Sequence, residues 1–370
     1  MKVLITGADG FIGKNLRVTL SEREDFEVLP ITRSIDEDAL MQAVAQTDAV
    51  VHLAGVNRPR DPAEFTADNS GFTARLCELL LATGRAVPVV FASSIQAVRD
   101  NPYGLSKRAA EQHLTDYAVH SGASVGLYRL ANVFGKWCRP NYNSAVATFC
   151  HNIAHGLPIR IDDPSAQLQL VYVDDVVAEF LSFLAEPPQG ATMLEAGPVY
   201  TATVCELVRQ IETFGEVRNS LITERVGEGL VRALYSTYVS YLPTEAFSYG
   251  VPKYSDPRGV FVEMLKTKDS GQFSFFTAHP GITRGGHYHH SKTEKFLVIK
   301  GRACFRFRHI LTNELYELNT SGERPMIVET IPGWAHDITN TGDDEMVVML
   351  WANEIFDRER PDTIASKVIA

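Results

Sequence analysis

The stretch Met1–Gly13, MKVLITGADGFIG, decides the fold of the first half of the chain. A short apolar run leads directly into Gly7, Gly10 and Gly13, which are spaced as GxxGxxG. In a strand–turn–helix unit such glycines allow a tight turn, a close approach of backbone to a pyrophosphate, and close packing of helix against strand. Because the motif follows a strand and opens a helix, it predicts dinucleotide binding rather than a turn without a ligand.

The hydrophobic pattern extends this unit along the chain. Residues 1 to about 245 alternate amphipathic stretches with the short apolar strands KVLITG, FEVLPIT, AVVHLAG, PVVFASS and VGLYRL. This alternation predicts an α/β fold with a doubly wound parallel sheet. After the passage YLPTEAFSYGVP, short strands at close intervals predict an all-β jelly-roll barrel. We therefore expect two domains, residues 1–247 and residues 248–370.

The composition is that of an ordinary globular enzyme, with 370 residues, 45% hydrophobic and 22% charged. A formal net charge of -10 argues against broad binding to nucleic acid or anionic membranes, so any phosphate site must be built locally. The N-terminus lacks the features of a signal peptide, and no apolar run approaches the ~20 residues that span a bilayer. Five cysteines without a CxxC pair fit a reducing compartment, so we expect a cytoplasmic protein with free thiols.

The end of the second predicted strand bears on the choice of cofactor. An acidic residue there would bind a ribose 2'-hydroxyl, but the chain reads Thr32-Arg33-Ser34. Arg33 can meet a 2'-phosphate with a charge-assisted contact, which favours NADPH, although it can also be a solvated surface charge. The residues expected to contact the cofactor are Gly7, Gly10, Phe11, Ile12, Gly13, Arg33, Leu53, Ala54, Gly55, Tyr103 and Lys107.

A proton-transfer pair follows in Tyr103-Gly-Leu-Ser-Lys107. A helix brings residues four apart to one face, so the Lys107 ammonium can lie beside the Tyr103 phenol. An ordinary phenol, with a pKa of ~10, needs that charge and the nicotinamide charge to exchange protons near neutrality. Tyr103 would protonate the alkoxide formed as hydride reaches a carbonyl, and Ser94 would hydrogen-bond the same oxygen. Ser93 is interpreted instead as capping or turning the backbone.

A second chemical centre lies in residues 281–301, GITRGGHYHHSKTEKFLVIKG. His287 and His289 are two apart, so both imidazoles point to one face of a strand, and Glu294 can return to meet them across a short turn. His336, in PGWAH, is the fourth predicted ligand. Three imidazoles and one carboxylate suit zinc, iron(II), manganese or nickel, and we favour zinc.

The remaining histidines of the sequence have simpler interpretations. His290 faces away from the ligands on an ideal strand, so it is a ligand in a bent strand, a catalytic base or a surface residue. The four predicted metal ligands can also be interpreted as side chains that fill the mouth of the barrel without binding a metal. His151 and His155 lack the glutamate of a metalloprotease motif and are interpreted as one helix face. His52 ends a buried strand and is interpreted as a satisfied core histidine.

The motifs of the first half resemble the extended short-chain dehydrogenase/reductases that act on nucleotide sugars. The resemblance rests on GxxGxxG, Ser94, YxxxK, Arg129-Leu-Ala-Asn132-Val-Phe-Gly and Tyr172-Val-Asp174-Asp175-Val. It implies a Rossmann domain with a substrate pocket partly formed by residues 132–144, with contacts at Ser94, Asn132, Arg139 and Asn143. Sugar dehydratases of this family carry Thr-Asp-Glu where this chain has Ser94-Ile95-Gln96, which favours a simple 4-keto reductase.

The second half resembles the cupins. The spacing Gly281-x5-His287-x-His289-x4-Glu294-x6-Gly301 matches the first cupin motif, and Pro332-Gly333-Trp-Ala-His336-x3-Asn340 resembles the second. The second motif departs from the usual PxG because proline and glycine are adjacent. The opening Asp256-Pro-Arg258-Gly259-Val-Phe-Val-Glu263 resembles the entry to sugar-epimerase cupins.

The order of the two halves, with HLAGVNRP, NPYGLSK, FGKWCRPNYNS, STYVSYLP and HHSKTEKFLV, resembles the CapF-type bifunctional enzymes of capsular and O-antigen polysaccharide synthesis. The resemblance implies a UDP-2-acetamido-2,6-dideoxy-4-hexulose as substrate. The cupin domain would epimerise C3, and the Rossmann domain would reduce C4 with NADPH. The product would be UDP-N-acetyl-L-talosamine, on the way to UDP-N-acetyl-L-fucosamine. The family also implies a homodimer with a metal-bearing cupin domain.

Chemistry sets the order of the two steps. A 4-keto group acidifies the C3 proton, so epimerisation must precede reduction of that ketone. His290 and Lys295 are the candidate bases, and the sequence does not choose between them. Two alternatives stay open: a monofunctional NADPH-dependent 4-ketoreductase whose cupin is a metal-stabilised dimerisation module, and a non-catalytic nucleotide-binding sensor.

Overall fold

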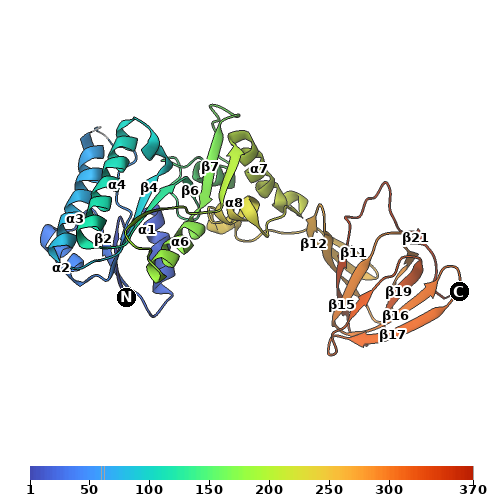
Figure 1. The fold of residues 1–370 in the computed structure, drawn as a ribbon. Helices are drawn as coiled ribbons and strands as arrows, with labels where there is room; N and C mark the ends of the chain where they lie inside the picture. Colours follow the sequence, from blue (N-terminus) through green and yellow to red (C-terminus); the bar gives the residue numbers. More distant parts are fainter. Residues whose placement is uncertain (60, 62, 370) are drawn as a thin grey trace. The chain divides into compact units, whose positions relative to one another are not determined.

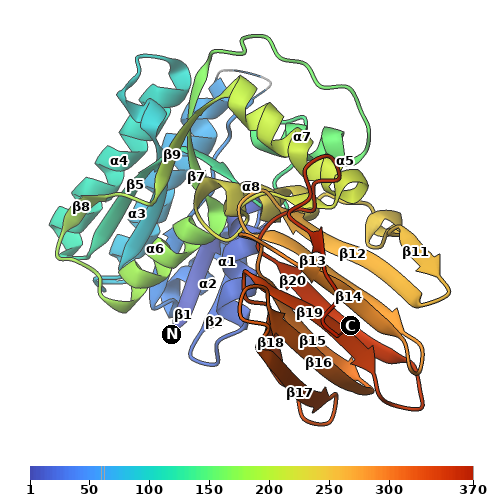
Figure 2. The same cartoon turned by 90° about the vertical axis from the view of Figure 1, so that its right-hand side faces the viewer.

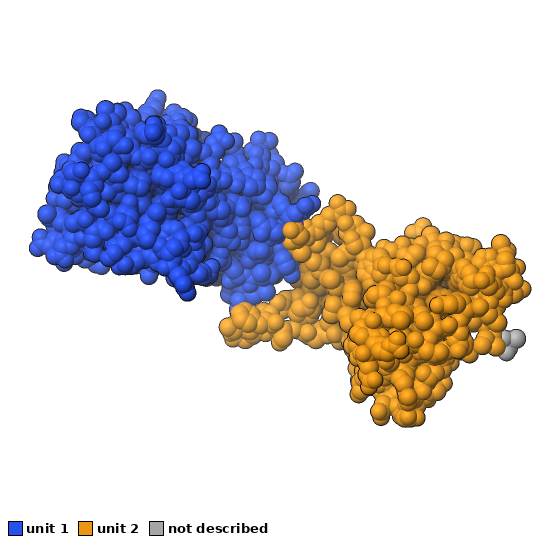
Figure 3. Space-filling view, turned by 60° about the horizontal axis from the view of Figure 1, so that its bottom comes forward, with its two compact units in different colours: residues 1–212, 228–243 blue, residues 213–227, 244–370 orange. Residues whose placement is uncertain are grey.

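The computed structural model describes residues 1–59, 61 and 63–369. These fall into two compact units (Figure 1, Figure 3). Unit 1 comprises Met1–Glu212 and Glu228–Pro243, and unit 2 comprises Thr213–Gly227 and Thr244–Ala370. The predicted division between residues 247 and 248 concerns domains that fold on their own, and it stays a prediction.

Unit 1 is built on a six-stranded sheet in the order β2-β1-β3-β4-β5-β8, in which every neighbouring pair is parallel. The chain builds outward from β1 first to β2 and then to β3 on the other side, so the carboxyl ends of β1 and β3 form a topological switch point. The strands are β1 Lys2–Thr6, β2 Glu27–Ile31, β3 Ala49–His52, β4 Val89–Ser94, β5 Val125–Leu130 and β8 Ala191–Leu194.

Helices cover both faces of this sheet (Figure 2). Because successive strand residues point to opposite faces, Leu4 packs with the core of α2, α3 and α4, whereas Val3 and Ile5 pack with that of α1 and α6. The predicted doubly wound α/β fold is therefore confirmed. The helices are α1 Phe11–Ser21, α2 Glu37–Gln46, η1 Phe65–Gly71, α3 Phe72–Ala82, η2 Ile95–Val98, α4 Pro102–Ser121 and α6 Val173–Ala185.

A smaller sheet in the order β6-β7-β9 carries the predicted substrate segment after β5. β6 pairs in parallel with β7, and β7 pairs antiparallel with β9. Its elements and the neighbouring helices are β6 Asn132–Phe134, α5 Ala145–Ala154, β7 Gln167–Tyr172, β9 Val199–Thr203, α7 Val204–Ser220 and α8 Gly229–Val239.

Unit 2 consists of two facing β-sheets, as predicted for the all-β second half (Figure 2). One follows the order β10-β12-β13-β20-β15-β18, with β11 on β12, and the other follows β17-β16-β19-β14-β21. Phe276, Phe296 and Phe305 belong to the apolar core of this unit. The first sheet has β10 Ile222–Thr223, β11 Lys253–Asp256, β12 Gly259–Thr267, β13 Gly271–Ala278, β15 Glu294–Lys300, β18 Ile327–Glu329 and β20 Met346–Ala352. The second has β14 Thr283–Tyr288, β16 Arg302–His309, β17 Leu315–Ser321, β19 Trp334–Asn340 and β21 Ile364–Ala365.

The helices of the described residues are too short or too polar to cross a lipid bilayer.

Candidate active site and metal centre

The β1–α1 turn requires glycine for two physical reasons. Gly7 has φ +67°, and a Cβ there would lie 2.8 Å from the Ala54 nitrogen. A Cβ on Gly13 would lie 2.5 Å from the Gly7 carbonyl oxygen. The turn therefore packs closely against the loop that follows β3. Helix α1 begins at Phe11, so the amides of its first turn lie at the switch point. Gly10 and Ile12, the other predicted contacts of this turn, lie at the same helix start.

The loop after β3 connects the predicted cofactor site to the predicted proton-transfer pair. The Leu53 and Ala54 amides both donate to the Thr6 hydroxyl, at 3.1 Å each. A Cβ on Gly55 would lie 3.4 Å from the Lys107 Nζ. A residue predicted to hold the cofactor thus lies beside a residue predicted to act in catalysis.

Arg33 lies just beyond the carboxyl end of β2, next to the same switch point. Its side chain is 82% exposed, and its guanidinium is 3.6 Å from the Asp68 carboxylate. A guanidinium with this exposure can contact a phosphate. The same exposure also fits the alternative interpretation of Arg33 as a solvated surface charge.

The start of α4 orients Tyr103 and Lys107. The Asn101 side chain caps the helix by accepting from the Gly104 amide at 2.8 Å, and proline occupies the first turn. Lys107 is buried, and its Nζ donates to the Ala92 carbonyl at 3.0 Å. Burial lowers the pKa of Lys107 to about 8, against an opposing effect of Glu111.

Tyr103 and Ser94 come together as the sequence predicts. Burial raises the pKa of the Tyr103 phenol, and its hydrogen bond with Ser94 partly offsets that rise. The lower pKa that the predicted proton transfer needs would have to come from other charges, for which the sequence suggests the nicotinamide and Lys107. Ser94 ends β4, and its hydroxyl also accepts from the Gln96 amide at 3.2 Å.

Ser93 lies next to Ser94 in β4 and is held by a charged pair. Its hydroxyl donates to Glu111 at 2.5 Å, and Arg129 donates to both oxygens of the same carboxylate, at 2.9 and 2.7 Å. The sequence analysis missed Glu111. The available signal was its position four residues after Lys107 on the same helix face.

A buried polar chain runs beneath the site. The Thr73 hydroxyl donates to the Asn69 carbonyl, so it must accept from His52 Nε2 at 2.8 Å. His52 Nδ1 then accepts from the Thr6 hydroxyl at 2.6 Å, which leaves a neutral ring with both nitrogens bonded. Burial and the Lys107 charge lower the pKa of His52 to about 3. His52 is thus the satisfied core histidine that the sequence suggests.

The hydrogen-bond chain continues from Asn69 to α4. The Asn69 side chain accepts from the Val56 amide at 2.7 Å and donates to the Ser106 hydroxyl at 2.9 Å. Ser106 in turn donates to the Tyr103 carbonyl at 2.8 Å. The position of Tyr103 is thus connected by hydrogen bonds to the strand that carries the cofactor glycines.

The predicted substrate residues lie on the exposed segment that begins at β6. Asn132 donates to the Gln169 carbonyl at 2.8 Å, and the Arg139 guanidinium lies 5.2 Å from the Tyr142 ring centre. Asn143 is exposed as well. Their roles in substrate binding stay predictions.

The four predicted metal ligands form one cluster in unit 2. The candidate ligand atoms of His287, His289, Glu294 and His336 all lie within 4.8 Å of one another. Glu294 Oε2 is 3.2 Å from His289 Nε2 and 3.4 Å from His336 Nε2. The register between β14 and β19 shifts at a bulge between Gly285 and His287. Such a bulge changes the direction in which the following side chains of the strand point.

The protonation states of the cluster suit a divalent metal. Burial lowers the pKa of His287 to about 4, so its imidazole keeps a free lone pair. Burial raises the pKa of Glu294, but its bonds to His289, His336 and Lys292 outweigh this and hold the carboxyl ionised. The buried His336 Nδ1 lacks a partner among the described residues. Imidazole nitrogens around a carboxylate are the donors that such a metal prefers.

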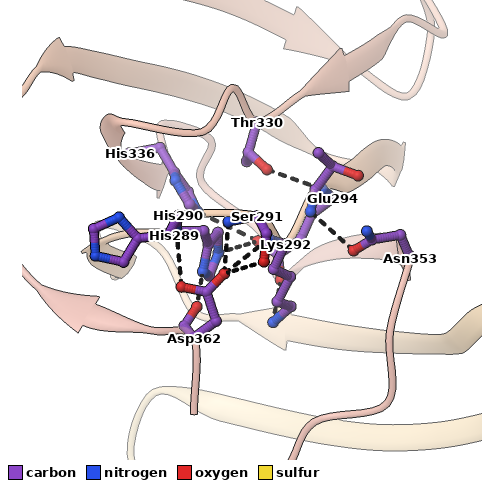
Figure 4. A network of polar contacts seen from close by, with 10 residues as sticks. His289, His290, Ser291, Lys292, Glu294, Thr330, His336, Asn353 and Asp362 are labelled. Atoms are coloured by element: carbon purple, nitrogen blue, oxygen red, sulfur yellow. Dashed lines mark hydrogen bonds and ion pairs between the residues drawn. The ribbon is translucent and has the colours of Figure 1, made fainter.

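The two predicted bases lie outside this cluster. The His290 side chain is exposed and points away from the neighbouring His289 and Glu294 (Figure 4). Lys295 is exposed and forms a close ion pair with Glu329. Lys292, which the sequence analysis missed, is 7% exposed, with its Nζ 2.9 Å from Glu294 Oε1. Nothing in the local pattern separates it from a solvated turn lysine.

Comparisons with known proteins match both halves of the chain. Residues 3–197 match the NAD dependent epimerase/dehydratase family, and residues 254–364 match the polysaccharide biosynthesis C-terminal domain. A UDP-2-acetamido-2,6-beta-L-arabino-hexul-4-ose reductase of Pseudomonas aeruginosa is 60% identical over 368 residues, covering 100% of this chain and 99% of that protein. A GDP-6-deoxy-D-mannose reductase of the same species is 26% identical over 222 residues, covering 51% of this chain and 72% of that protein.

The structural comparison covers the full chain as well. The crystal structure of the capsular polysaccharide assembling protein CapF from Staphylococcus aureus is 41% identical and has a TM-score of 0.92. It covers 100% of both chains.

Proposed function

The chain belongs to the NAD dependent epimerase/dehydratase family and, within it, to the CapF-type proteins, and on this basis we propose that it is a bifunctional UDP-sugar enzyme. The proposed substrate is a UDP-2-acetamido-2,6-dideoxy-4-hexulose. Unit 2 epimerises C3, and unit 1 then reduces the C4 ketone with NADPH. The product is UDP-N-acetyl-L-talosamine, which leads to UDP-N-acetyl-L-fucosamine for capsule or O-antigen.

The observation that carries the reductase assignment is the hydrogen bond of Ser94 with Tyr103, four residues before the buried Lys107 on α4. NADPH, when bound, supplies the hydride for C4. The Tyr103 hydroxyl gives its proton to the C4 oxygen, and the Ser94 hydroxyl donates a hydrogen bond to the same oxygen. Lys107 contributes positive charge beside the phenol. Gly7, Gly13 and Arg33 are the residues proposed to hold the cofactor.

The epimerase assignment depends on the cluster in unit 2. His287, His289, Glu294 and His336 would hold the metal, for which we propose zinc. When bound, the metal supplies a Lewis acid for the ketone oxygen, which acidifies the C3 proton. A side chain at the barrel mouth must move that proton. His290 and Lys295 stay candidates, and the contact of Lys292 with Glu294 adds a third.

A single variant separates the two activities. Tyr103→Phe keeps the ring but removes the proton that C4 needs, so NADPH oxidation should fall at least ~100-fold. C3 of the ketosugar should still exchange with heavy water, as followed by NMR. Absence of C3 exchange in both wild type and variant would overturn the epimerase assignment. Unchanged NADPH oxidation would overturn the reductase mechanism.

The second candidate is a reductase whose cupin serves as a metal-stabilised dimerisation module. It is favoured by the name of the Pseudomonas aeruginosa relative, which mentions only a reductase. Product analysis with NADPH and the 4-ketosugar decides between them. NMR coupling constants that show inversion at C3 support the bifunctional enzyme, and retention at C3 supports the reductase. A homodimer is proposed in either case, and light scattering tests it.

A further inference from the structure

The carboxyl-terminal segment runs alongside the strand that carries the first metal ligands. β21 pairs with β14, which places Ala365 opposite His287 and Ile364 opposite Tyr288. The Ser366 amide donates to the Gly286 carbonyl at 2.8 Å. This pairing brings Asp362, far away in the sequence, to the turn that joins β14 to β15.

The Asp362 carboxylate binds three consecutive amides of that turn (Figure 4). Its Oδ1 accepts from the His290 amide at 2.8 Å. Its Oδ2 accepts from the Ser291 amide at 2.7 Å, the Lys292 amide at 2.9 Å and the Ser291 hydroxyl at 3.1 Å. A carboxylate surrounded by backbone donors in this way forms strong, charge-assisted bonds that fix the path of the turn.

The rest of the turn is held in the same way by side chains. The Thr293 amide donates to Asn353 Oδ1, and the Glu294 amide donates to Thr330 Oγ1, both at 2.9 Å. Every backbone amide from residue 290 to residue 294 thus donates a hydrogen bond to a side-chain oxygen. The turn between ligands His289 and Glu294 takes its shape from these partners, and Asp362 supplies the acceptor for most of it.

The backbone carbonyl of Asp362 also contacts one of the proposed metal ligands, His289. The carbonyl oxygen lies in close contact with His289 Nδ1. A carbonyl can only accept, so Nδ1 carries a proton, and in the neutral ring that metal binding requires the lone pair is on Nε2. That nitrogen is the one that faces Glu294, 3.2 Å from Oε2. Outer partners of this kind commonly set the tautomer and direction of a ligating histidine.

We propose that Asp362 is a positioning residue of the metal centre: its carboxylate holds the turn between His289 and Glu294, and its carbonyl sets His289 as an Nε2 ligand. The inference rests on the metal site of the proposed function. It assigns the carboxyl-terminal segment a role in metal affinity, although that segment contributes no ligand atom.

The test measures zinc affinity of the full-length protein by competition with a chromophoric chelator. Asp362→Asn keeps the size but places an amide NH2 against the turn donors, so affinity should fall about 10- to 100-fold. Ser291→Ala removes only the hydroxyl bond and should cost about threefold. The matched control is Asp357→Asn, because Asp357 lies in the same segment and accepts from the Glu359 amide at 2.9 Å. It should bind zinc like the wild type.

A second measurement reports on the order of the turn in the zinc-free protein. Hydrogen exchange of the amides of residues 290–294 in the zinc-free protein should be faster in Asp362→Asn than in the wild type, and unchanged in Asp357→Asn. Zinc affinity of Asp362→Asn within twofold of the wild type would overturn the positioning role. If Asp362→Asn does not fold, Ser291→Ala decides, and unchanged affinity and exchange there overturn the inference. A wild type that binds no zinc would instead contradict the metal site itself.

Discussion

The Ser93 hydroxyl donates to the Glu111 carboxylate at 2.5 Å, and this contact distinguishes it from the adjacent Ser94, which is proposed to act in catalysis. Ser94 bonds with Tyr103 in the first turn of α4, the helix that also carries Glu111, while Ser93 is held in a buried charged pair.

The two serines should therefore respond differently to alanine. Ser94→Ala removes a donor to the C4 oxygen and should lower kcat for NADPH oxidation about 100-fold. Ser93→Ala leaves kcat close to the wild type but lowers the free energy of unfolding by about 1–3 kcal/mol, because Glu111 loses a buried partner. Steady-state kinetics and urea unfolding measure the two effects. The reverse pattern would contradict the assignment.

Arg33 should determine the preference between the two nicotinamide cofactors. Arg33→Ala removes a charge-assisted contact and should raise KM for NADPH about 10-fold or more, while KM for NADH stays unchanged. Arg23→Ala is the control, because Arg23 is an exposed arginine of the same domain that pairs with Asp25. An equal KM for NADPH in wild type and Arg33→Ala would leave Arg33 as a surface charge.

The metal should be required for C3 exchange and not for hydride transfer. Glu294→Gln removes the carboxylate that contacts His289 and His336, so zinc affinity should fall at least ~10-fold and C3 exchange should be lost. Reduction of a ketosugar that already has the inverted C3 should persist. Asp343→Asn is the control, because Asp343 is an exposed carboxylate of unit 2 that pairs with Arg302. C3 exchange at the wild-type rate in zinc-free Glu294→Gln would exclude a catalytic metal.

His52 should make unit 1 less stable in acid. Its ordinary pKa of 6.5 applies when the chain is unfolded, and burial lowers the folded pKa to about 3. The unfolded chain therefore binds the proton first, so this part of the stability is present above pH 6.5 and is lost as the pH falls toward 3. Between pH 7 and pH 5 the loss should be about 2 kcal/mol.

The measurement compares urea unfolding of the wild type with His52→Phe, which cannot titrate. Trp137 fluorescence reports on unit 1 when Trp334 and Trp351 are both replaced by phenylalanine. The stability difference between the two proteins should shrink by about 2 kcal/mol over this range. A pH-independent difference would show that His52 titrates alike in both states.

Features encoded over a few residues could be predicted from the sequence. The glycines of the β1–α1 turn, the pair Tyr103 and Lys107, and the spacing of His287 and His289 each depend on one turn of helix or one stretch of strand. Their relative positions follow from backbone geometry alone. His336 could be predicted as well, because the second cupin-like motif marks it.

The rest of the site depends on which strands and segments lie side by side. The local pattern predicted His290 and Lys295 as bases, but His290 in the turn and Lys295 on β15 are both exposed, whereas Lys292 in the turn is buried. Whether a turn lysine is buried is decided by the chain packed over it.

The sequence by itself determined the two fold types, the glycines of the β1–α1 turn and the members of the candidate metal cluster, because these depend on short-range spacing. Only the tertiary structure decided that Glu111 holds Ser93 and that Asp362 holds the turn between His289 and Glu294. His289 and Asp362 are separated by 73 residues and meet because β21 pairs with β14. A contact between such distant residues depends on strand register, which no local periodicity specifies.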